Sequence, residues 1–217
     1  MTLQEELNAL RTKAAKGLAA QGHDYFVKDI NQSGRLNQVP EKGDLAPSFV
    51  LPDDKGNLVS SEELLKRGPL IVSFYRGDWC VFCNLELRAL QRSLAEFQRF
   101  GASLVGISPQ SVAYSHMNAD KRNVQYQVLS DAGNKIANQY GLMFSMPESM
   151  INAYKTFGLD LAQVNGKRNG VDVPVPATFV INTDGRIVYR FLDADYTKRA
   201  EPADIIACLM DISSKAA

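Results

Sequence analysis

The feature that most constrains the fold is an apolar run that leads directly into a helix carrying two cysteines. Residues 69–75, PLIVSFY, have the length and composition of a β-strand buried on both faces. Residues 80–100 then repeat apolar side chains at near-helical spacing and end before Gly101. A strand, a short turn and a long helix therefore place Cys80 at a helix N-terminus. Cys83 follows one turn later on the same face.

Strands and helices alternate along most of the remaining chain. Strands are expected over residues 103–108 and 126–130, helices over 111–122 and 134–140, a hairpin over 177–192, and a closing helix over 201–214. Before the cysteines, residues 48–60 predict two short strands around a turn, and 60–68 a short helix. This order indicates an α/β sandwich with a mixed central sheet.

Two segments fall outside this alternation. Residues 1–42 predict an N-terminal helical extension and a linker, ahead of a main domain over 43–217. Apolar residues share one face of that helix, namely Leu3, Leu7, Leu10, Ala14 and Leu18. The helix packs on its own chain by default, and a homodimer through this face is the alternative. Residues 23–45 are polar and predict a connecting segment, and 142–173 predict an insertion with one helix near 148–157.

Composition and charge exclude several classes of protein. Hydrophobic residues make up 45% and charged residues 22% of the chain, which suits a domain with a real core. Basic and acidic residues balance at 24 each, which disfavours a nucleic-acid or anionic-membrane partner. We expect neither a secretory leader nor a membrane span. Only three cysteines occur, which is typical of a reducing compartment and predicts a cytoplasmic protein.

The cysteine pair is a redox couple, half of a metal site, or two buried small residues. A structural metal site needs four ligands, and the chain offers only Cys208, His23 and His116 besides the pair. We therefore expect no metal. At a helix N-terminus a thiol pKa of about 8.5 falls to roughly 3.5–7.5, so a redox pair is favoured. Arg76 adds positive charge four residues before Cys80, or is a solvated loop residue.

Five motifs, in order, resemble a known family. They are GDLAPSFVLPDDKG, VSFYRGDWCVFCNLELRALQ, LVGISPQS, VLSDAGNKIANQYGL and VPATFVINTDGRIVYRF. Together they resemble the alkyl hydroperoxide reductase/thiol-specific antioxidant (AhpC/TSA) family, peroxiredoxin-like members of the thioredoxin superfamily, over about residues 43–211. The resemblance implies a thioredoxin-like three-layer α/β/α sandwich. It also implies Cys80 as the attacking cysteine, Cys83 as its partner, and no organic cofactor.

Three positions depart from the peroxidase pattern or point to another activity. Typical members carry Thr or Ser three residues before the attacking cysteine, where this chain has Gly77. They also carry an arginine near the position of Thr178, whose charge Arg76 would then supply. The stretch VPATF is similar to that of thioredoxin-type reductases, which implies a cis Pro176 facing the pair.

Four further side chains receive weaker assignments. Trp79 either covers the pair as part of a docking surface or packs on the sheet. Glu86 is expected to be an exposed helix residue, and Tyr196 and Arg199 to lie in a solvated loop.

Three functions follow in order of preference. The first is a thiol-dependent peroxidase that reduces hydrogen peroxide or organic hydroperoxides and is recycled by thioredoxin or a similar dithiol. The second is a thiol–disulfide oxidoreductase acting on protein disulfides, and the third a non-catalytic thioredoxin-fold binding module. Substitution of Cys80 by serine separates the third from the other two.

Overall fold

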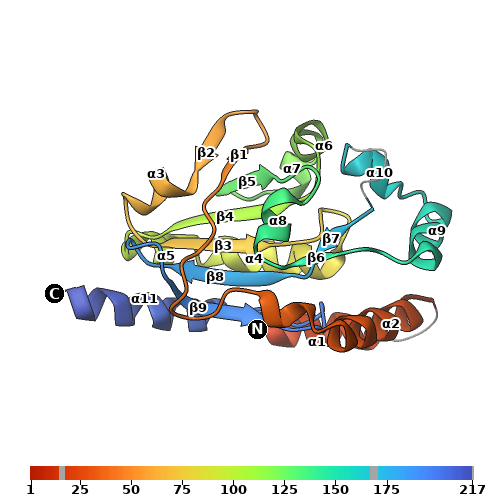
Figure 1. Ribbon diagram of the computed structural model, residues 1–217, viewed down its shortest axis with the longest axis horizontal. Helices are drawn as coiled ribbons and strands as arrows, with labels where there is room; N and C mark the ends of the chain where they lie inside the picture. Colours follow the sequence, from red (N-terminus) through yellow and green to blue (C-terminus); the bar gives the residue numbers. More distant parts are fainter. Residues whose placement is uncertain (15–17, 167–170, 217) are drawn as a thin grey trace.

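The protein is built around a mixed five-stranded sheet, as predicted. We analysed a computed structural model that describes residues 1–14, 18–166 and 171–216 (Figure 1). The sheet has the order β5-β4-β3-β8-β9. Its strands are β3 (Leu70–Phe74), β4 (Ser103–Ser108), β5 (Gln127–Ser130), β8 (Ala177–Ile181) and β9 (Ile187–Leu192). β3, β4 and β5 run parallel, whereas β8 is antiparallel to both β3 and β9.

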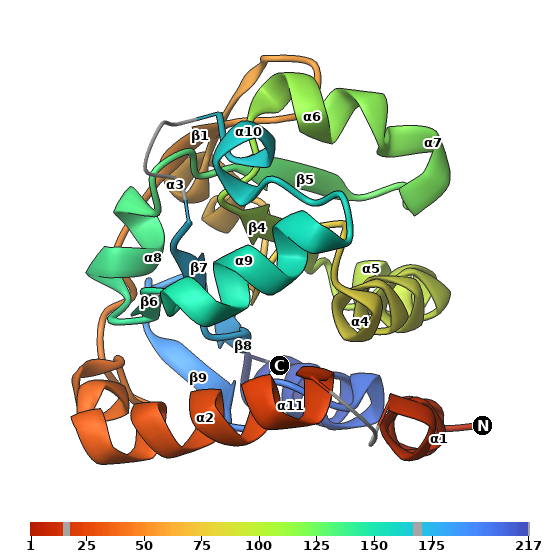
Figure 2. The same cartoon turned by 90° about the vertical axis from the view of Figure 1, so that its right-hand side faces the viewer.

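Each face of the sheet is covered by its own apolar layer (Figure 2). Side chains alternate along β3, so Ile71 belongs to one core cluster and Val72 and Phe74 to the other. The first layer contains α4 (Val81–Arg92), α5 (Leu94–Arg99) and α11 (Pro202–Ala216). The second contains α3 (Ser61–Leu65), α8 (Lys135–Gln139) and the hairpin of β1 (Val50–Pro52) and β2 (Leu58–Ser60). This is the predicted three-layer sandwich.

The helices that follow Cys80 and β4 are more broken than predicted. The long helix expected over 80–100 is divided at Ser93, which ends α4 and begins α5 with non-helical backbone angles. The helix expected over 111–122 is likewise divided at Asn118 into α6 (Val112–Met117) and α7 (Ala119–Arg122). None of the helices in the described parts of the chain is long and apolar enough to cross a membrane.

The N-terminal extension consists of α1 (Leu3–Ala14), α2 (Leu18–Ser33) and a short 3-10 turn, η1 (Arg35–Gln38). Leu3 and Leu7 are buried in the core, so α1 packs on its own chain, as expected by default. Leu10, on the same predicted face, is partly buried against this core, whereas Ala14 and Leu18 lie outside the described side chains.

The prediction of a connecting segment over residues 23–45 is wrong for residues 23–33, which belong to α2. Phe26 and Ile30, four residues apart, form a second apolar stripe that is fully buried. This burial stabilises α2 across a sequence that is otherwise polar.

The insertion contains the predicted helix and two elements that were not predicted. α9 (Glu148–Thr156) matches the helix expected near 148–157. A one-turn helix, α10 (Leu161–Val164), follows it. β6 (Met143–Phe144) pairs with β7 (Val173–Pro174) as a small ribbon, which is too short to leave a periodic signal. Residues 167–170 of the insertion lie outside the described residues.

Candidate active site at the paired cysteines

The two cysteines lie where the strand–turn–helix pattern predicts. β3 ends at Phe74, a short loop follows, and Cys80 is the N-cap residue of α4. The Cys83 thiol donates a hydrogen bond to the Cys80 sulfur at 2.8 Å. Both thiols are free and buried, with only 4% of Cys80 and none of Cys83 exposed. A disulfide between them therefore needs little movement of the chain.

The pKa values of the two thiols are driven apart. Burial raises the pKa of Cys80, but the Cys83 hydrogen bond and the charges of Arg76 and Arg199 outweigh it and hold the pKa below its ordinary value. Burial and the neighbouring Cys80 sulfur raise the pKa of Cys83 well above its ordinary value. The site therefore favours a thiolate at Cys80 and a thiol at Cys83, which donates to it.

Arg76 is a buried cation rather than a solvated loop residue, with 1% of its surface exposed. Its guanidinium lies over the rings of Tyr196 and Trp79, at 4.3 and 4.8 Å from their centroids. It also donates to the Tyr154 hydroxyl at 3.0 Å. Among the described residues no carboxylate is within ion-pair distance of Arg76. A buried cation without a carboxylate needs another counter-charge, and a Cys80 thiolate is a candidate, because the charge of Arg76 lowers the pKa of Cys80.

Gly77 is explained by its neighbour Trp79. The backbone of Gly77 has φ +141°, and a Cβ there would lie 2.5 Å from the indole nitrogen of Trp79. A hydroxyl-bearing residue therefore does not fit without moving the indole ring. Trp79 itself lies against Arg76 and, at 5.1 Å between ring centroids, against Tyr154. Trp79 is partly buried against the apolar layer on this face of the sheet, which also contains Cys80 and Cys83.

A second buried cation, Arg199, replaces the arginine that the family pattern places near Thr178. Arg199 donates to the Cys83 sulfur at 3.4 Å and to the Glu86 carboxylate at 2.7 Å. Thr178 does not contact the thiols in any hydrogen bond of the structure and instead donates to Glu86 at 3.2 Å. Burial raises the pKa of Glu86 to about 7 against the charge of Arg199.

The expected solvated positions of Arg199 and Glu86 are therefore wrong, since each is at most 2% exposed. Glu86 was detectable, because it lies three residues after Cys83 on the apolar face of α4. Arg199 had no such signal, since only the tertiary fold brings it to the pair.

Pro176 has the expected place but not the expected geometry. Its neighbour Ala177 pairs with Phe74, so Pro176 lies beside the end of β3, where the loop to Cys80 begins. The Val175–Pro176 peptide bond is trans, and the predicted cis bond is wrong. The backbone N–H of Val175 donates to Leu142 at 2.7 Å, which continues the small β6–β7 ribbon into β8. An extended chain paired on this side suits a trans bond.

A polar network fixes the loop before Cys80. The backbone N–H of Asp78 donates to the side chain of Gln110, and its carbonyl accepts from Asn84 in α4. The Asp78 carboxylate pairs with Arg122 of α7 at 2.8 Å, and both side chains are buried. The loop is thereby tied to the sheet on one side and to α4 on the other.

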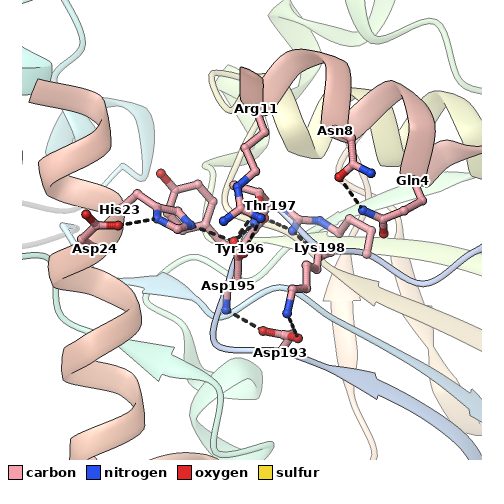
Figure 3. Close-up of polar contacts among 11 residues, drawn as sticks. Gln4, Asn8, Arg11, His23, Asp24, Asp193, Asp195, Tyr196, Thr197 and Lys198 are labelled. Atoms are coloured by element: carbon pink, nitrogen blue, oxygen red, sulfur yellow. Dashed lines mark hydrogen bonds and ion pairs between the residues drawn. The ribbon is translucent and has the colours of Figure 1, made fainter. Parts of the chain in front are cut away.

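Residues 193–201 connect the N-terminal helices to the thiol site (Figure 3). Asp195 accepts from His23 of α2 at 2.8 Å and pairs with Arg11 of α1 at 3.3 Å. Burial raises the pKa of Asp195, but hydrogen bonds from His23 and Thr197 outweigh it and lower the pKa to about 2. The ring of the adjacent Tyr196 packs on His23, at 5.2 Å between ring centroids, and on Arg76. A groove of about 760 Å³ lies between α2 and residues 190–198, and neither cysteine lines it.

Within the described part of the chain, no three side chains of histidine, cysteine, aspartate or glutamate gather as a metal-binding group. The acidic groups of the thiol site instead pair with arginine, as Glu86 does with Arg199.

Comparison with known proteins agrees with this fold. Residues 42–190 match the model of the AhpC/TSA family, and the chain belongs to that family. It is 36% identical to chloroplastic peroxiredoxin Q of Gentiana triflora over 101 residues, which are 46% of each chain. It is 31% identical to chloroplastic peroxiredoxin Q of Suaeda salsa over 133 residues, 60% of this chain and 56% of that one. The chain thus spans about half the length of the curated relatives that it matches.

Solved structures extend the likeness beyond the matched sequence. The crystal structure of peroxidoxin BcpB from Mycobacterium tuberculosis aligns with 79% of this chain and 97% of its own, with a TM-score of 0.61 and 26% identity. Reduced 2-Cys peroxiredoxin of Plasmodium vivax aligns with 81% of this chain and 83% of its own, with a TM-score of 0.59 and 18% identity. The fold is therefore the peroxiredoxin type of the thioredoxin-like sandwich.

Proposed function

We propose that the protein is a thiol-dependent peroxidase that reduces hydrogen peroxide or an organic hydroperoxide. The observation that carries this proposal is the pair of buried sulfurs 2.8 Å apart, together with buried Arg76, which has no carboxylate partner in the part of the chain that the structure describes. Arg76 favours a thiolate at Cys80, and a thiolate is the nucleophile that attacks a peroxide bond. Membership of the AhpC/TSA family supports the same chemistry.

The reaction has two steps at the pair. The Cys80 thiolate attacks a peroxide oxygen, the O–O bond breaks, and Cys80 becomes a sulfenic acid while the alcohol or water departs. Cys83 then attacks the sulfenic sulfur, which releases water and forms the Cys80–Cys83 disulfide. A thioredoxin-like dithiol returns the disulfide to two thiols, and this recycling partner belongs to the proposal.

Burial of the pair favours the peroxidase over the protein-disulfide reductase. A protein disulfide must reach the attacking sulfur in line, yet Cys80 is 4% exposed and Cys83 is not exposed at all. A small peroxide needs a much smaller opening. Gly77, where a peroxidase usually has a hydroxyl, favours the reductase as the second candidate, and so does the Cys-x-x-Cys spacing itself.

Stopped-flow peroxide consumption by the reduced protein tests the proposal. We expect a rate far above that of a free thiol at the same pH, complete loss in Cys80→Ser, and a trapped sulfenic acid by mass spectrometry in Cys83→Ser. Cys208→Ser is the matched control and should keep the full rate. Cys208 lies in α11 and lines a separate pocket with Lys42 and Lys215, which neither Cys80 nor Cys83 lines. Insulin reduction without peroxide turnover would instead select the reductase.

A cytoplasmic location stays a prediction, and we propose it only on the sequence grounds given above. A homodimer stays a prediction too, but not through Leu3 and Leu7 of α1, which are buried within the chain.

A further inference from the structure

The buried charges around the two cysteines do not balance unless one thiol is ionised. Arg76 and Arg199 bring two positive charges into a site from which water is excluded. Glu86, paired with Arg199 at 2.7 Å, supplies at most one negative charge, since burial raises its pKa to about 7. Unpaired buried charges are strongly unfavourable, so the site needs one more negative charge. In the reduced protein the Cys80 thiolate supplies it, and Cys83 keeps its proton and donates to Cys80.

Attack on a peroxide removes that charge. The Cys80 sulfur gives an electron pair to the peroxide oxygen, the O–O bond breaks, and the departing oxygen carries the negative charge away and takes a proton from water. Cys80 is left as a neutral sulfenic acid. The site then contains Arg76 and Arg199 against Glu86 alone, one positive charge in excess.

We propose that this excess charge ionises Cys83 only after Cys80 is oxidised, with Arg199 as the group that holds the Cys83 thiolate and Glu86 as the residue that positions Arg199. This inference rests on the proposed peroxidase reaction and assigns roles within it. The Cys83 thiolate attacks the sulfenic sulfur, the S–O bond breaks, and the released hydroxide takes the proton that Cys83 has lost.

The geometry gives Arg199 this role directly. Its Nη2 lies 3.4 Å from the Cys83 sulfur, while its Nε is held by Glu86. Thr178 holds the other carboxylate oxygen of Glu86 from β8, so the position of the guanidinium is fixed by two elements of the fold. Glu86 therefore has two opposite effects on Cys83. It orients Arg199 toward the Cys83 sulfur, but its negative charge also offsets the positive charge of Arg199 that stabilises a Cys83 thiolate.

The other titratable groups that face Cys83 do not replace this pair. Tyr75, at the end of β3, and Tyr196 both have their pKa values raised by burial, so their phenols stay neutral. Arg76 lies against Tyr196, Trp79 and the Tyr154 hydroxyl. His23 contacts Asp195 and faces Tyr196 from α2, farther out.

An NMR titration of protein labelled with a carbon isotope at the cysteine Cβ atoms tests the inference without peroxide. The Cβ shift of Cys83 reports its own ionisation in the reduced protein and in Cys80→Ser, where a neutral hydroxyl stands for the sulfenic acid. We expect the ionisation midpoint of Cys83 to fall by at least one pH unit in Cys80→Ser, about tenfold in proton affinity. An unchanged midpoint would overturn the inference.

Further substitutions in the Cys80→Ser protein separate an electrostatic role from a structural one. Glu86→Gln should lower the Cys83 midpoint further, because it frees the charge of Arg199, whereas Arg199→Gln should raise it by at least one unit. If Arg199→Gln does not fold, Glu86→Gln/Arg199→Gln removes both buried charges and should also raise the midpoint. Arg190→Gln on β9 is the matched control and should have no effect. If Glu86→Gln and Arg199→Gln shifted the Cys83 ionisation midpoint in the same direction, the proposed roles would be contradicted.

These outcomes are independent of the peroxidase assay. A protein that shows the expected titrations but consumes no peroxide would refute the proposed function and leave the charge coupling in place. A protein that consumes peroxide but whose Cys83 ionisation midpoint is the same with and without the Cys80 sulfur would refute the charge coupling and leave the proposed function in place.

Discussion

We expect Arg76 to set the reactivity of the pair, because its charge lowers the pKa of Cys80 and no carboxylate among the described residues pairs with it. In Arg76→Gln the pKa of Cys80 should rise, since the largest nearby positive charge is gone while burial still disfavours the thiolate. The expected rise is roughly one to three units, so alkylation of Cys80 at neutral pH should slow by about tenfold or more. The rate of iodoacetamide labelling measures this shift. It is followed from about pH 5 to about pH 10, across the ordinary range of thiol pKa values. Arg67→Gln, at an exposed position, serves as control, and equal pH profiles for the two variants would contradict the role of Arg76.

Gly77 shows why one residue can depart from a family pattern without loss of the site. Gly77→Ala should destabilise the protein by more than Gly56→Ala, although both glycines have positive φ. Positive φ alone costs about 1–3 kcal/mol at either position. Only at Gly77 does the added Cβ also meet Trp79, whereas nothing lies within 4 Å at Gly56. Urea unfolding of the two variants measures the difference, and equal losses of unfolding free energy would show that the indole moves at no cost.

At the scale of elements, α2 belongs to the core of the thiol site. Phe26 is fully buried and its ring lies 5.1 Å from that of Tyr196, which in turn covers Arg76. Phe26→Ala should therefore cost about 3–5 kcal/mol of unfolding free energy and speed the alkylation of Cys80. Tyr25→Ala, on the exposed face of the same helix, is the matched control and should leave both nearly unchanged. If Phe26→Ala lost as little unfolding free energy as Tyr25→Ala, α2 would contribute little to the core around the thiol site.

Asp195 makes the attachment of α1 and α2 sensitive to acid. Its pKa is lowered from 3.8 to about 2 in the folded protein, so its contribution to stability is present above its unfolded pKa and is lost as the pH falls toward 2. Asp195→Asn should therefore destabilise the protein at neutral pH, and the difference from wild type should shrink below about pH 4. Thermal unfolding across this range measures it. A difference that stays constant with pH would mean that the ion pairs of Asp195 do not hold the helices.

Elements were predictable from sequence where one local pattern determined them. The apolar run of β3, the N-cap position of Cys80 and the hairpin of β8 and β9 each follow from neighbouring residues. The helix over residues 23–33 was missed because only Phe26 and Ile30 mark its buried face. The β6–β7 ribbon was missed because it joins segments on either side of the insertion.

The charge arrangement could not be predicted for a different reason. Arg76, Glu86 and Arg199 are polar residues, and sequence patterns assign such residues to the surface. Their burial depends on partners that are distant in the chain, such as Arg199 beside Cys83. The family resemblance suggested that the site needs an arginine and placed it near Thr178. In this chain Arg199, from another segment, supplies the charge beside Cys83 instead.

At the scale of the whole molecule, the N-terminal extension and the family domain form one core. Leu3 and Leu7 of α1 and Phe26 and Ile30 of α2 belong to the same apolar cluster as Cys80 and Cys83. A chain that starts after Ser33 should therefore expose apolar surface, unfold at lower temperature and associate. Size-exclusion chromatography and thermal unfolding measure this. A monomer with an unchanged melting temperature would show that residues 1–33 contribute nothing to the core.

Trp79 is the chain's sole tryptophan, and it lies against Arg76 at the edge of the thiol pair. Its fluorescence therefore comes from one known position. Indole emission is sensitive to nearby charge, and the charge beside Arg76 disappears when a Cys80 thiolate is oxidised and returns when the thiolate is restored. The protein consequently carries its own optical reporter, with which oxidation and re-reduction of Cys80 can be timed without any added dye.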